Sequence, residues 1–376
     1  MKQFDYIIAG GGAAGLTLAY LLTGFEDKQK SILIIEKDSK STNDRTWCFW
    51  QKGQNLLEQL VFKTWANARV ATSKWHKTYA LAPYSYKMIR AIDFYAFMKE
   101  NLNVPQVVWV QETVEQISPN GVVKTDSSEY KGQLVFSSIF NLNALQKEAS
   151  TTLLQHFKGW VIETASDSFL PDTATYMDFS VDQQGDCRFG YVLPFSSKRA
   201  LVEYTLFSPA MLSDTEYTLG LKSYIKQLGI EGYTIAEEEF GVIPMTDHRF
   251  VIKQSENVYN IGINGGFAKA STGYTFLRGQ QILQAMVENL KKGKAPDSHL
   301  PYQTSRFKAY DATLLRVLAE GKYTGEEIFG SLFRKNGLHT MFRFLDEETG
   351  LLEELKIMAS TPLLNFGKNF LKQYVD

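Results

Sequence analysis

The sequence has little of several features that mark particular functional classes. Of its 376 residues only two are cysteines, Cys48 and Cys187, too far apart for a metal or redox motif. Its five histidines are scattered, so we predict no metal site. The 40 basic residues are balanced by 41 acidic ones, and without a basic excess we expect no nucleic-acid partner. The few cysteines fit a reducing compartment.

A clear targeting or membrane-spanning segment is also lacking. The N-terminus has no basic stretch followed by a small-residue cleavage site, so we predict no signal peptide. Residues 6–25 carry no charge and approach the length of a bilayer span, but a glycine cluster lies near their middle. A strand, a turn and a helix explain this pattern better. We therefore expect no transmembrane helix and a chain that is soluble or peripherally bound on the cytoplasmic side.

What is present first is a nucleotide-binding signature. In "DYIIAGGGAAGLTLAYLL" an apolar strand pattern runs into Gly-x-Gly-x-x-Gly and a helical pattern, and the strand-like "SILIIEKD" follows. This order, with an acid about 20 residues after the last glycine, is the dinucleotide fingerprint. Its glycines permit a tight turn, close approach of a pyrophosphate and close helix packing. The residues predicted to bind the cofactor are Gly10, Gly12, Ala13, Ala14, Gly15 and Glu36. The position at the N-terminus favours FAD over NAD.

A second glycine-rich segment, residues 257–283, supports a flavin. It reads as a strand, a glycine cluster, a loop through "STG" and a helix. A second loop and helix N-terminus of this kind could face the flavin ring or the ribityl phosphate. The predicted contacts are Gly262, Gly265, Gly266, Thr272 and Gly273. The alternative is an ordinary turn before a surface helix.

The two segments lie more than two hundred residues apart, so we predict a mixed α/β fold with a discontinuous Rossmann-type FAD-binding domain. We assign to it residues 1–70, about 130–150 and 240–290. Residues 71–129 and 151–239 hold strand-like runs and are expected to form a substrate domain with a mixed or antiparallel sheet. After residue 300 the pattern becomes helical, which predicts a C-terminal helical cap over 300–376.

One predicted strand of the substrate domain, "RALVEYTLFS", carries an acid among apolar residues. Side-chain alternation places Leu201, Glu203, Thr205 and Phe207 on one face and Val202, Tyr204 and Leu206 on the other. A single charge in a strand is most often solvated. The alternative is a carboxyl group placed for chemistry.

Several segments together resemble the lycopene cyclase family, nearly from end to end and in the family's order. They are "NDRTWCFW" at 43–50, "YKMIRAIDFY" at 86–95, "YMDF" at 176–179, "YVLPF" at 191–195, "LVEYT" at 201–205, "GVIPMT" at 241–246, "GINGGFAKASTGYTF", "YDATLLRVL" and "FRFLDEETG". The resemblance is strongest to bacterial lycopene β-cyclases. It implies a fold of the p-hydroxybenzoate hydroxylase group, a need for reduced FAD with NADPH as electron source, and closure of the linear ends of lycopene into β-ionone rings. The product would be β-carotene, formed through γ-carotene without net redox change, as by an intramolecular lyase (isomerase).

The resemblance also implies site residues. Glu203 matches the family's catalytic glutamate, Asp178 is a second acid candidate, and Tyr204 stands where the family has another acid. A desolvated carboxyl group with a raised pKa suits the protonation of a double bond, and its carboxylate suits the resulting cation. Aromatic rings could add cation–π stabilisation. The residues expected in the substrate pocket are Arg45, Trp47, Phe49, Trp50, Tyr176 and Tyr204.

Two other functions compete. A flavin-dependent isoprenoid reductase or monooxygenase would use the same fold, although the Asp-Gly pair usual in aromatic hydroxylases is absent from "GQLVFSSIFN". A nonenzymatic lipid-binding chaperone would have lost the flavin and be colourless. Because lycopene resides in the bilayer, we expect the cap to lie on the membrane surface, with arginines at the headgroups and phenylalanines below. The residues expected there are Arg306, Phe307, Arg316, Phe333, Arg334, Phe342, Arg343 and Phe344.

Overall fold

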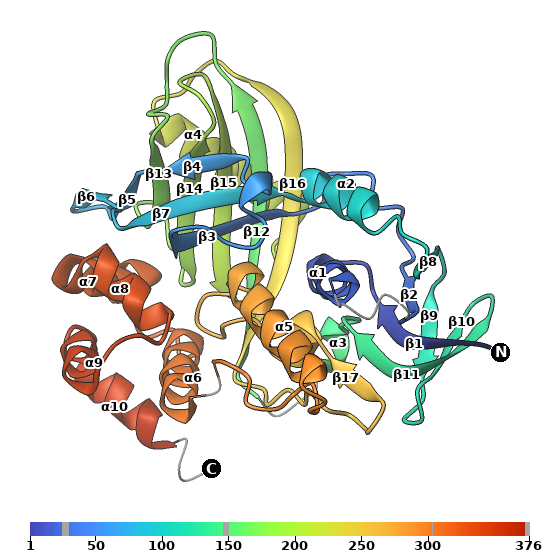
Figure 1. The fold of residues 1–376 in the computed structure, drawn as a ribbon. Coiled ribbons are helices and arrows are strands. Elements are labelled where there is room, and N and C mark those ends of the chain that lie inside the picture. The colour runs from blue at the N-terminus through green and yellow to red at the C-terminus, as the bar shows by residue number, and fades with distance from the viewer. Residues whose placement is uncertain (25–29, 146–149, 303, 373–376) are drawn as a thin grey trace. The chain divides into compact units, whose positions relative to one another are not determined.

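The computed structural model describes residues 1–24, 30–145, 150–302 and 304–372 (Figure 1). The chain divides into two compact units, each built from three separate segments. Unit 1 comprises Met1–Asn43, Arg90–Glu148 and His248–Gln303, and unit 2 comprises Asp44–Ile89, Ala149–Asp247 and Thr304–Asp376.

Unit 1 is built on a seven-stranded sheet with the order β8-β2-β1-β11-β10-β9, to which β17 adds beside β11. Its strands are β1 (Lys2–Ala9), β2 (Ile32–Ile35), β8 (Val107–Val110), β9 (Val114–Ile117), β10 (Val122–Thr125), β11 (Glu129–Ser137) and β17 (Val258–Asn260). The pairs β8–β2, β2–β1, β1–β11 and β11–β17 are parallel. Parallel strands are buried on both faces, which explains the uninterrupted apolar runs of β1 and β2.

The helices of unit 1 are α1 (Ala13–Thr23), α2 (Ala91–Asn101), the short α3 (Leu142–Leu145), the 3₁₀ turn η2 (Gly262–Gly265) and α5 (Phe276–Lys291). Aromatic contacts join the three long helices, since Tyr20 of α1 meets Phe97 of α2 and Phe94 of α2 meets Phe276 of α5. This packing brings the first and last segments of unit 1 together, although they are distant in sequence.

The larger sheet of unit 2 is also seven-stranded, with the order β16-β12-β15-β14-β13-β5-β6. Its strands are β5 (Asn67–Ala71), β6 (His76–Ala80), β12 (Thr152–Glu163), β13 (Thr173–Asp178), β14 (Cys187–Pro194), β15 (Arg199–Ser208) and β16 (Thr234–Thr246). All neighbours pair antiparallel except β13 and β5. One face is covered by α4 (Asp214–Gln227), which begins with a capping box between Ser213 and Glu216.

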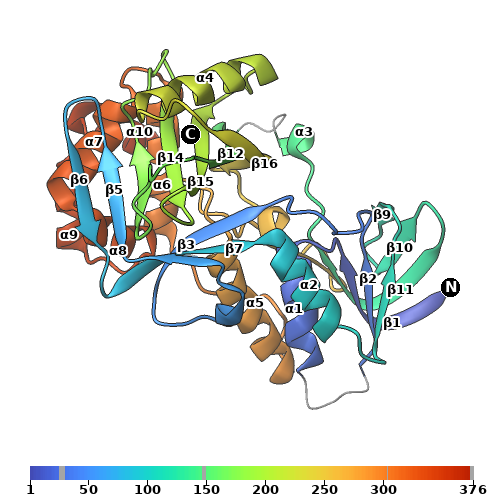
Figure 2. The same ribbon diagram turned by 90° about the horizontal axis from the view of Figure 1, so that it is seen from above.

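The other face of this sheet meets a second sheet and the C-terminal helices (Figure 2). The second sheet has the order β3-β7-β4, formed by β3 (Thr46–Lys52), β4 (Lys63–Trp65) and β7 (Tyr84–Arg90), with the 3₁₀ turn η1 (Glu58–Leu60). The helices are α6 (Ser305–Ala319), α7 (Gly325–Asn336), α8 (Leu338–Leu345), α9 (Leu351–Met358) and α10 (Leu363–Lys372). Among the residues described, no helix is both long and apolar enough to cross a bilayer.

The unit boundaries differ from the predicted domains in four places. Residues 240–247, at the end of β16, belong to unit 2, because β16 pairs with β12. Residues 44–70 belong to unit 2, because β3 and β4 pair with β7 and β5 pairs with β13. Residues 90–129 belong to unit 1, because β8 extends the parallel sheet beside β2. The C-terminal helices are part of unit 2 and not a separate cap. Strand type was readable locally, but the partner of each strand was not.

The predicted basic and aromatic surface of the cap is wrong in its phenylalanines. Phe307, Phe333 and Phe342 are buried in the core, and Phe344 is half-buried against Phe307 and Tyr310. Arginines of these helices form ion pairs, such as Arg306 with Glu354 and Arg343 with Glu353. A phenylalanine side chain contributes more to the free energy of folding when it is buried in the core, because burial removes its whole surface from water.

Candidate functional site

The first glycine loop of unit 1 has the close approaches that the fingerprint requires. Gly10 has a φ of 104°, and a Cβ atom there would lie 2.3 Å from Ser138 Oγ. A Cβ atom on Gly15 would lie 2.0 Å from the carbonyl oxygen of Gly10, so α1 can approach the loop only with glycine at this position. Beside Gly12, which caps α1, a Cβ atom would meet open space.

Glu36, at the end of β2, lies against this loop. Its Oε2 accepts a hydrogen bond from the Gly11 amide at 2.6 Å, and its Oε1 accepts one from the Asp38 amide at 2.9 Å. The acid of the fingerprint is therefore held beside the glycines by backbone donors.

The second glycine segment meets the first, as expected for two parts of one cofactor site. Gly262 has a φ of 62°, and a Cβ atom there would lie 3.0 Å from the Cβ atom of Ala14. Gly266 and Gly273 also have positive φ, Gly265 is buried in η2, and Thr272 accepts a weak hydrogen bond from the Tyr274 amide in the loop before α5.

Unsatisfied polar atoms lie in the same segment. Ser271 Oγ and both amide atoms of the Gln280 side chain are buried and have no hydrogen-bond partner among the residues described. Buried polar atoms of this kind are costly unless a ligand or water satisfies them. The open space at Gly12 and these atoms fit a polar cofactor such as FAD.

In unit 2, Glu203 lies on the opposite face of β15 from α4, as the alternation predicted. Val202, Tyr204 and Leu206 pack in one apolar cluster with residues of α4. Glu203 is 8% exposed. Its strand neighbour across β14 is Tyr191, and its neighbour across β12 is Gly159. The carboxyl group is therefore not a solvated strand charge.

A second carboxyl group lies beside it. Gly159 pairs with Glu203 on one side and with Glu239 of β16 on the other. A Cβ atom on Gly159 would lie 2.9 Å from Glu203 Cγ and 3.1 Å from Glu239 Cγ, so both side chains lean over the glycine. Burial first, and then the neighbouring Glu239, raise the pKa of Glu203 well above its usual range.

β3 covers this pair with small polar groups. Thr46 donates a hydrogen bond to Glu239 Oε2 at 2.6 Å. Burial first, and then the two neighbouring glutamates, raise the pKa of the Cys48 thiol well above its usual range, so the thiol is protonated at neutral pH. Alternation along β3 places Thr46, Cys48 and Trp50 on this face and Trp47 and Phe49 on the other, while Arg45 precedes the strand and is exposed.

Aromatic rings continue the site along the sheet. The Tyr176 ring makes edge contacts with Trp50, Tyr86 and Tyr191 at centroid distances of 6.4, 5.5 and 6.1 Å. The Trp50 ring stacks on Phe342 at 4.7 Å, and its Nε1 donates to Asp346. Of the predicted pocket residues, Trp50 and Tyr176 thus join one cluster.

Tyr204 and Asp178 lie on the other face of the sheet. Asp178 pairs with Gly190, which pairs with Tyr204, and residues paired across strands share a face. Asp178 accepts hydrogen bonds from Ser180 and from Tyr224 of α4. Tyr176 and Asp178 face opposite sides although they are two residues apart, because the register of β13 shifts between Thr175 and Asp178. The structure therefore does not bring Asp178 or Tyr204 to Glu203.

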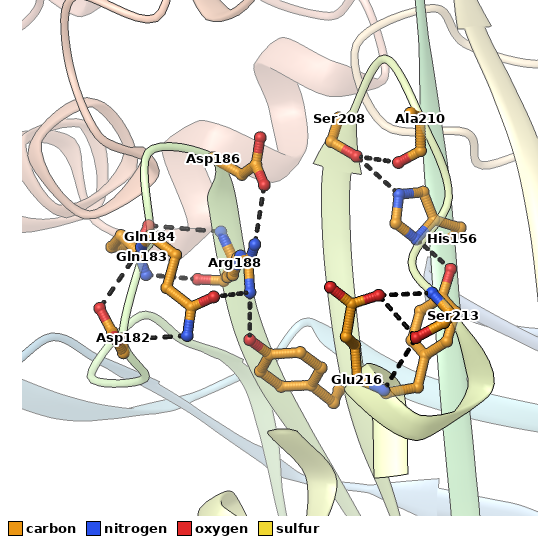
Figure 3. Close-up of polar contacts among 12 residues, drawn as sticks. His156, Asp182, Gln183, Gln184, Asp186, Arg188, Ser208, Ala210, Ser213 and Glu216 are labelled. Carbon is orange, nitrogen blue, oxygen red and sulfur yellow. Dashed lines mark hydrogen bonds and ion pairs between the residues drawn. The ribbon is translucent and has the colours of Figure 1, made fainter. Parts of the chain in front are cut away.

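The α4 face carries polar networks of its own (Figure 3). Arg188 donates to the Tyr204 hydroxyl, to Gln184 and to Asp186. His156 is fully buried, with Nε2 2.7 Å from Ser208 Oγ and Nδ1 2.5 Å from the Tyr217 hydroxyl. Burial lowers the pKa of His156 to about 4, so the ring is neutral.

Sequence reasoning missed Glu239, Thr46 and Cys48. The run "AEEEFGVIPMT" did contain a signal, because alternation places Glu239 on the same face as Gly241 and away from Glu238. Nothing in the sequence tells which strand lies beside β12, however, so the pairing with Glu203 was not readable.

The chain shares its fold with solved structures that include a reductase-like protein and a probable FAD-dependent monooxygenase, and the predicted fold class is confirmed. A geranylgeranyl bacteriochlorophyll reductase-like protein from Thermoplasma acidophilum superposes with a TM-score of 0.66 at 12% identity, covering 98% of each chain. PqsL, a probable FAD-dependent monooxygenase from Pseudomonas aeruginosa, superposes with a TM-score of 0.57 at 14% identity, over 85% of this chain and 98% of that one.

Sequence comparison identifies the family. The model described as "Lycopene cyclase protein" matches residues 5–369, and the chain belongs to the lycopene cyclase family. The lycopene beta-cyclase of Pseudescherichia vulneris is 24% identical over 381 residues, covering 97% of this chain and 95% of that protein. The chloroplastic neoxanthin synthase of Solanum tuberosum is 27% identical over 311 residues, covering 77% of this chain and 61% of that protein.

Proposed function

We propose that this chain is a lycopene β-cyclase, an intramolecular lyase that closes the linear ends of lycopene to β-ionone rings. Family membership supports the carotenoid substrate, because the relatives named above include a lycopene beta-cyclase. The observation that carries the reaction type is Glu203, a buried carboxyl group with a raised pKa beside aromatic rings.

The proposed chemistry is general acid–base catalysis through a carbocation. Glu203, whose pKa is raised by burial, donates its proton to the terminal double bond, and the carboxylate left behind stabilises the tertiary cation. Loss of a ring proton then gives the cyclic product, so the numbers of atoms and electrons do not change. Rings such as Trp50 and Tyr176 would add about 0.5–2 kcal/mol each where a face meets the cation.

We propose FAD as the cofactor, held by the two glycine segments of unit 1. The N-terminus of α1 would bind the pyrophosphate, Glu36 the ribose, and the segment of Gly262–Gly265 with Ser271 the rest of the molecule. In its reduced form, with NADPH as electron source, FAD would supply no electrons to the product.

The test is a mass and retention analysis of the product. Purified protein is incubated under low oxygen with lycopene in liposomes, FAD and NADPH. A product of unchanged mass with the retention of β-carotene is expected. A product heavier by two hydrogens or by one oxygen would instead indicate a reductase or a monooxygenase. A protein that stays colourless when FAD is added would contradict both enzyme functions and favour a lipid-binding chaperone.

We also propose peripheral docking on the cytoplasmic face of a bilayer, through a surface other than the predicted one. The helices α9 and α10 turn leucines outward, namely Leu351, Leu352, Leu355, Leu363, Leu364 and Leu371, each at least 60% exposed. Their inward side carries the buried polar residues Glu354, Asn365 and Asn369. The exposed Lys356 and Lys368 lie among these leucines and would reach anionic headgroups.

Liposome co-sedimentation of a Leu352→Glu, Leu364→Glu double variant tests this docking. We expect loss of binding, whereas Leu219→Glu, at a leucine 63% exposed on α4, should bind as the wild type does. Unchanged binding by the double variant would contradict the proposal. A wild-type dimer that only this variant dissociates would point to a second copy on the leucine surface.

A further inference from the structure

We propose that Glu203 and Glu239 form a carboxyl pair that shares one proton, and that Glu239 is a positioning residue that keeps this proton on Glu203. The proposal deepens the proposed function, because it names the group that, together with burial, sets the acid strength of Glu203. It requires no contact between Glu239 and the substrate.

The geometry of the pair depends on a glycine in the strand between them. Glu203 on β15 and Glu239 on β16 lie across β12 from each other, at a distance that a side chain on β12 would normally fill. At Gly159 this side chain is missing, and both Cγ atoms lie within about 3 Å of the place where its Cβ atom would be. The two glutamate side chains therefore lean toward each other above Gly159, and the third neighbour of this place is Leu201 Cδ1 at 3.1 Å.

The hydrogen bonds of Glu239 leave one of its carboxyl oxygens available to bind the shared proton. Glu239 Oε2 accepts from Thr46, while Glu239 Oε1 is buried and has no partner among the donors described. A buried carboxylate oxygen without a donor is costly. A proton between this oxygen and Glu203 removes the cost for both groups at once.

The groups that face the pair do not supply an alternative charge balance. β3 contributes Thr46 and Cys48, and β7 and β14 contribute Tyr86 and Tyr191. Further along the strands, Arg199 is ion-paired with Glu163 and Glu237. Burial first, and then the pair, raise the pKa of the Cys48 thiol, so it carries no balancing charge. Two carboxylates side by side would repel each other, and one shared proton is the usual outcome for such a dyad.

The pair can both donate and recover the one proton that the proposed reaction requires. One proton passes from Glu203 to the substrate carbon, and the pair then carries two negative charges beside the cation. The ring carbon next to the cation loses one proton to the pair, the C–H electrons form the ring double bond, and the pair is restored. No oxidant or reductant is consumed.

The experiment compares Glu239→Gln with Glu238→Gln in the purified, FAD-loaded protein. Glu238 is the neighbouring residue on the same strand, but it pairs with Trp160 in the register, and its side chain is 57% exposed next to Lys158. A glutamine at 239 can still accept the hydrogen bond from Thr46, so loss of that contact does not confound the result. Flavin content and melting temperature verify the fold of each variant.

The first readout needs no substrate. Infrared difference spectra over a pH titration follow the C=O stretch of protonated carboxyl groups, with isotope-labelled glutamate to separate this band from flavin. We expect a wild-type band that persists at neutral pH, disappears in Glu203→Gln, and in Glu239→Gln titrates lower by about one pH unit or more, because the repulsion is gone. Glu238→Gln should titrate as the wild type does. No such band in the wild type, or an unchanged midpoint in Glu239→Gln, would overturn the proposal.

The second readout is the pH profile of cyclisation. In Glu239→Gln the alkaline limb of kcat/KM should move to lower pH by the same amount as the infrared midpoint, with KM unchanged. A uniform loss of kcat at every pH, without a shift, would overturn the positioning role. If the wild type cyclises nothing, the proposed function fails, but the infrared titration still decides whether the pair exists.

Discussion

The two faces of the larger sheet of unit 2 bury acidic groups in different ways. On the α4 face, Asp178 accepts hydrogen bonds at both oxygens, from Ser180 and Tyr224. On the opposite face, Glu239 has one oxygen without a donor, and the pKa of Glu203 is raised by burial and by Glu239. Both faces share the strand β15, where Glu203 and Tyr204 are consecutive residues.

This difference distinguishes buried acids that stabilise the fold from buried acids that are suited to proton transfer. A buried acid with all its partners in place contributes to stability and has little tendency to exchange its proton. A buried acid with incomplete partners costs stability and holds a proton that it can deliver. Thr205 Oγ1 and Gln155 Oε1, on the same face as Glu203, are also buried without partners. On the α4 face, Trp160 Nε1 and Arg188 Nε also lack a partner among the residues described, so the contrast between the faces lies in the acids themselves.

The largest effect is expected when one acid on each face is replaced by its amide. Glu203→Gln should lower the rate of cyclisation on the order of 100- to 10,000-fold, because it removes the general acid. Asp178→Asn should change the rate far less and should lower the free energy of unfolding by about 1–3 kcal/mol. Product formation and thermal melts measure both. Equal loss of activity in the two variants would remove the distinction between the faces.

The same Glu203→Gln variant should be more stable than the wild type at neutral and alkaline pH. The folded-state pKa of Glu203 lies above its ordinary value of 4.5, so the wild type loses stability as pH rises from 4.5 through the folded value. The glutamine does not titrate. The melting temperature of Glu203→Gln should exceed that of the wild type by a margin that grows as pH rises from the acid range. Melting curves that stay parallel with pH would contradict a raised pKa of Glu203.

Two glycines provide a matched pair of backbone tests. An added Cβ at Gly190 would lie 2.1 Å from the packed ring of Tyr224, so Gly190→Ala should cost about 1–3 kcal/mol of stability. At Gly159 the added Cβ meets the movable side chains of Glu203 and Glu239. Gly159→Ala should therefore reduce activity more than stability. Chemical unfolding and product assays measure both variants, and the same balance of stability and activity losses in the two would mean that the faces have equivalent roles.

His156 should make the α4 face sensitive to acid. Its folded pKa of about 4 lies below the ordinary value of 6.5, so its stabilising contribution is present above pH 6.5 and is lost as pH falls toward 4. The loss should be on the order of 3 kcal/mol. His156→Gln should be less stable near pH 7 and should lose less stability than the wild type on acidification, as urea unfolding at several pH values will reveal.

The smallest effect is expected for Tyr204→Phe. The variant removes one hydrogen bond from Arg188, which keeps Gln184 and Asp186 as partners, so it should cost about 1 kcal/mol. Cyclisation should continue at nearly the wild-type rate. A large loss of activity would contradict this expectation and would support the prediction from the sequence that Tyr204 belongs to the substrate site.

Several parts of the molecule were predictable because they depend on neighbouring residues. The strand, glycine loop and helix of residues 2–23 follow from the sterics of glycine, and the two faces of β15 follow from alternation. The domain boundaries were not predictable, since β8 could be read as a strand but not as the partner of β2. The face of Asp178 was also hidden, because a register shift in β13 reverses the alternation.

By itself the sequence determined a nucleotide-binding fold, a family and one acid, because glycine spacing, alternation and motif order are local properties of the chain. Only the tertiary structure decided what accompanies that acid. The strands β15, β12 and β16 come from distant parts of the sequence, and their order in the sheet brings Glu239 over Gly159 toward Glu203. The pKa of a buried carboxyl group depends on such neighbours and on the water they exclude, and neither is written in its own segment.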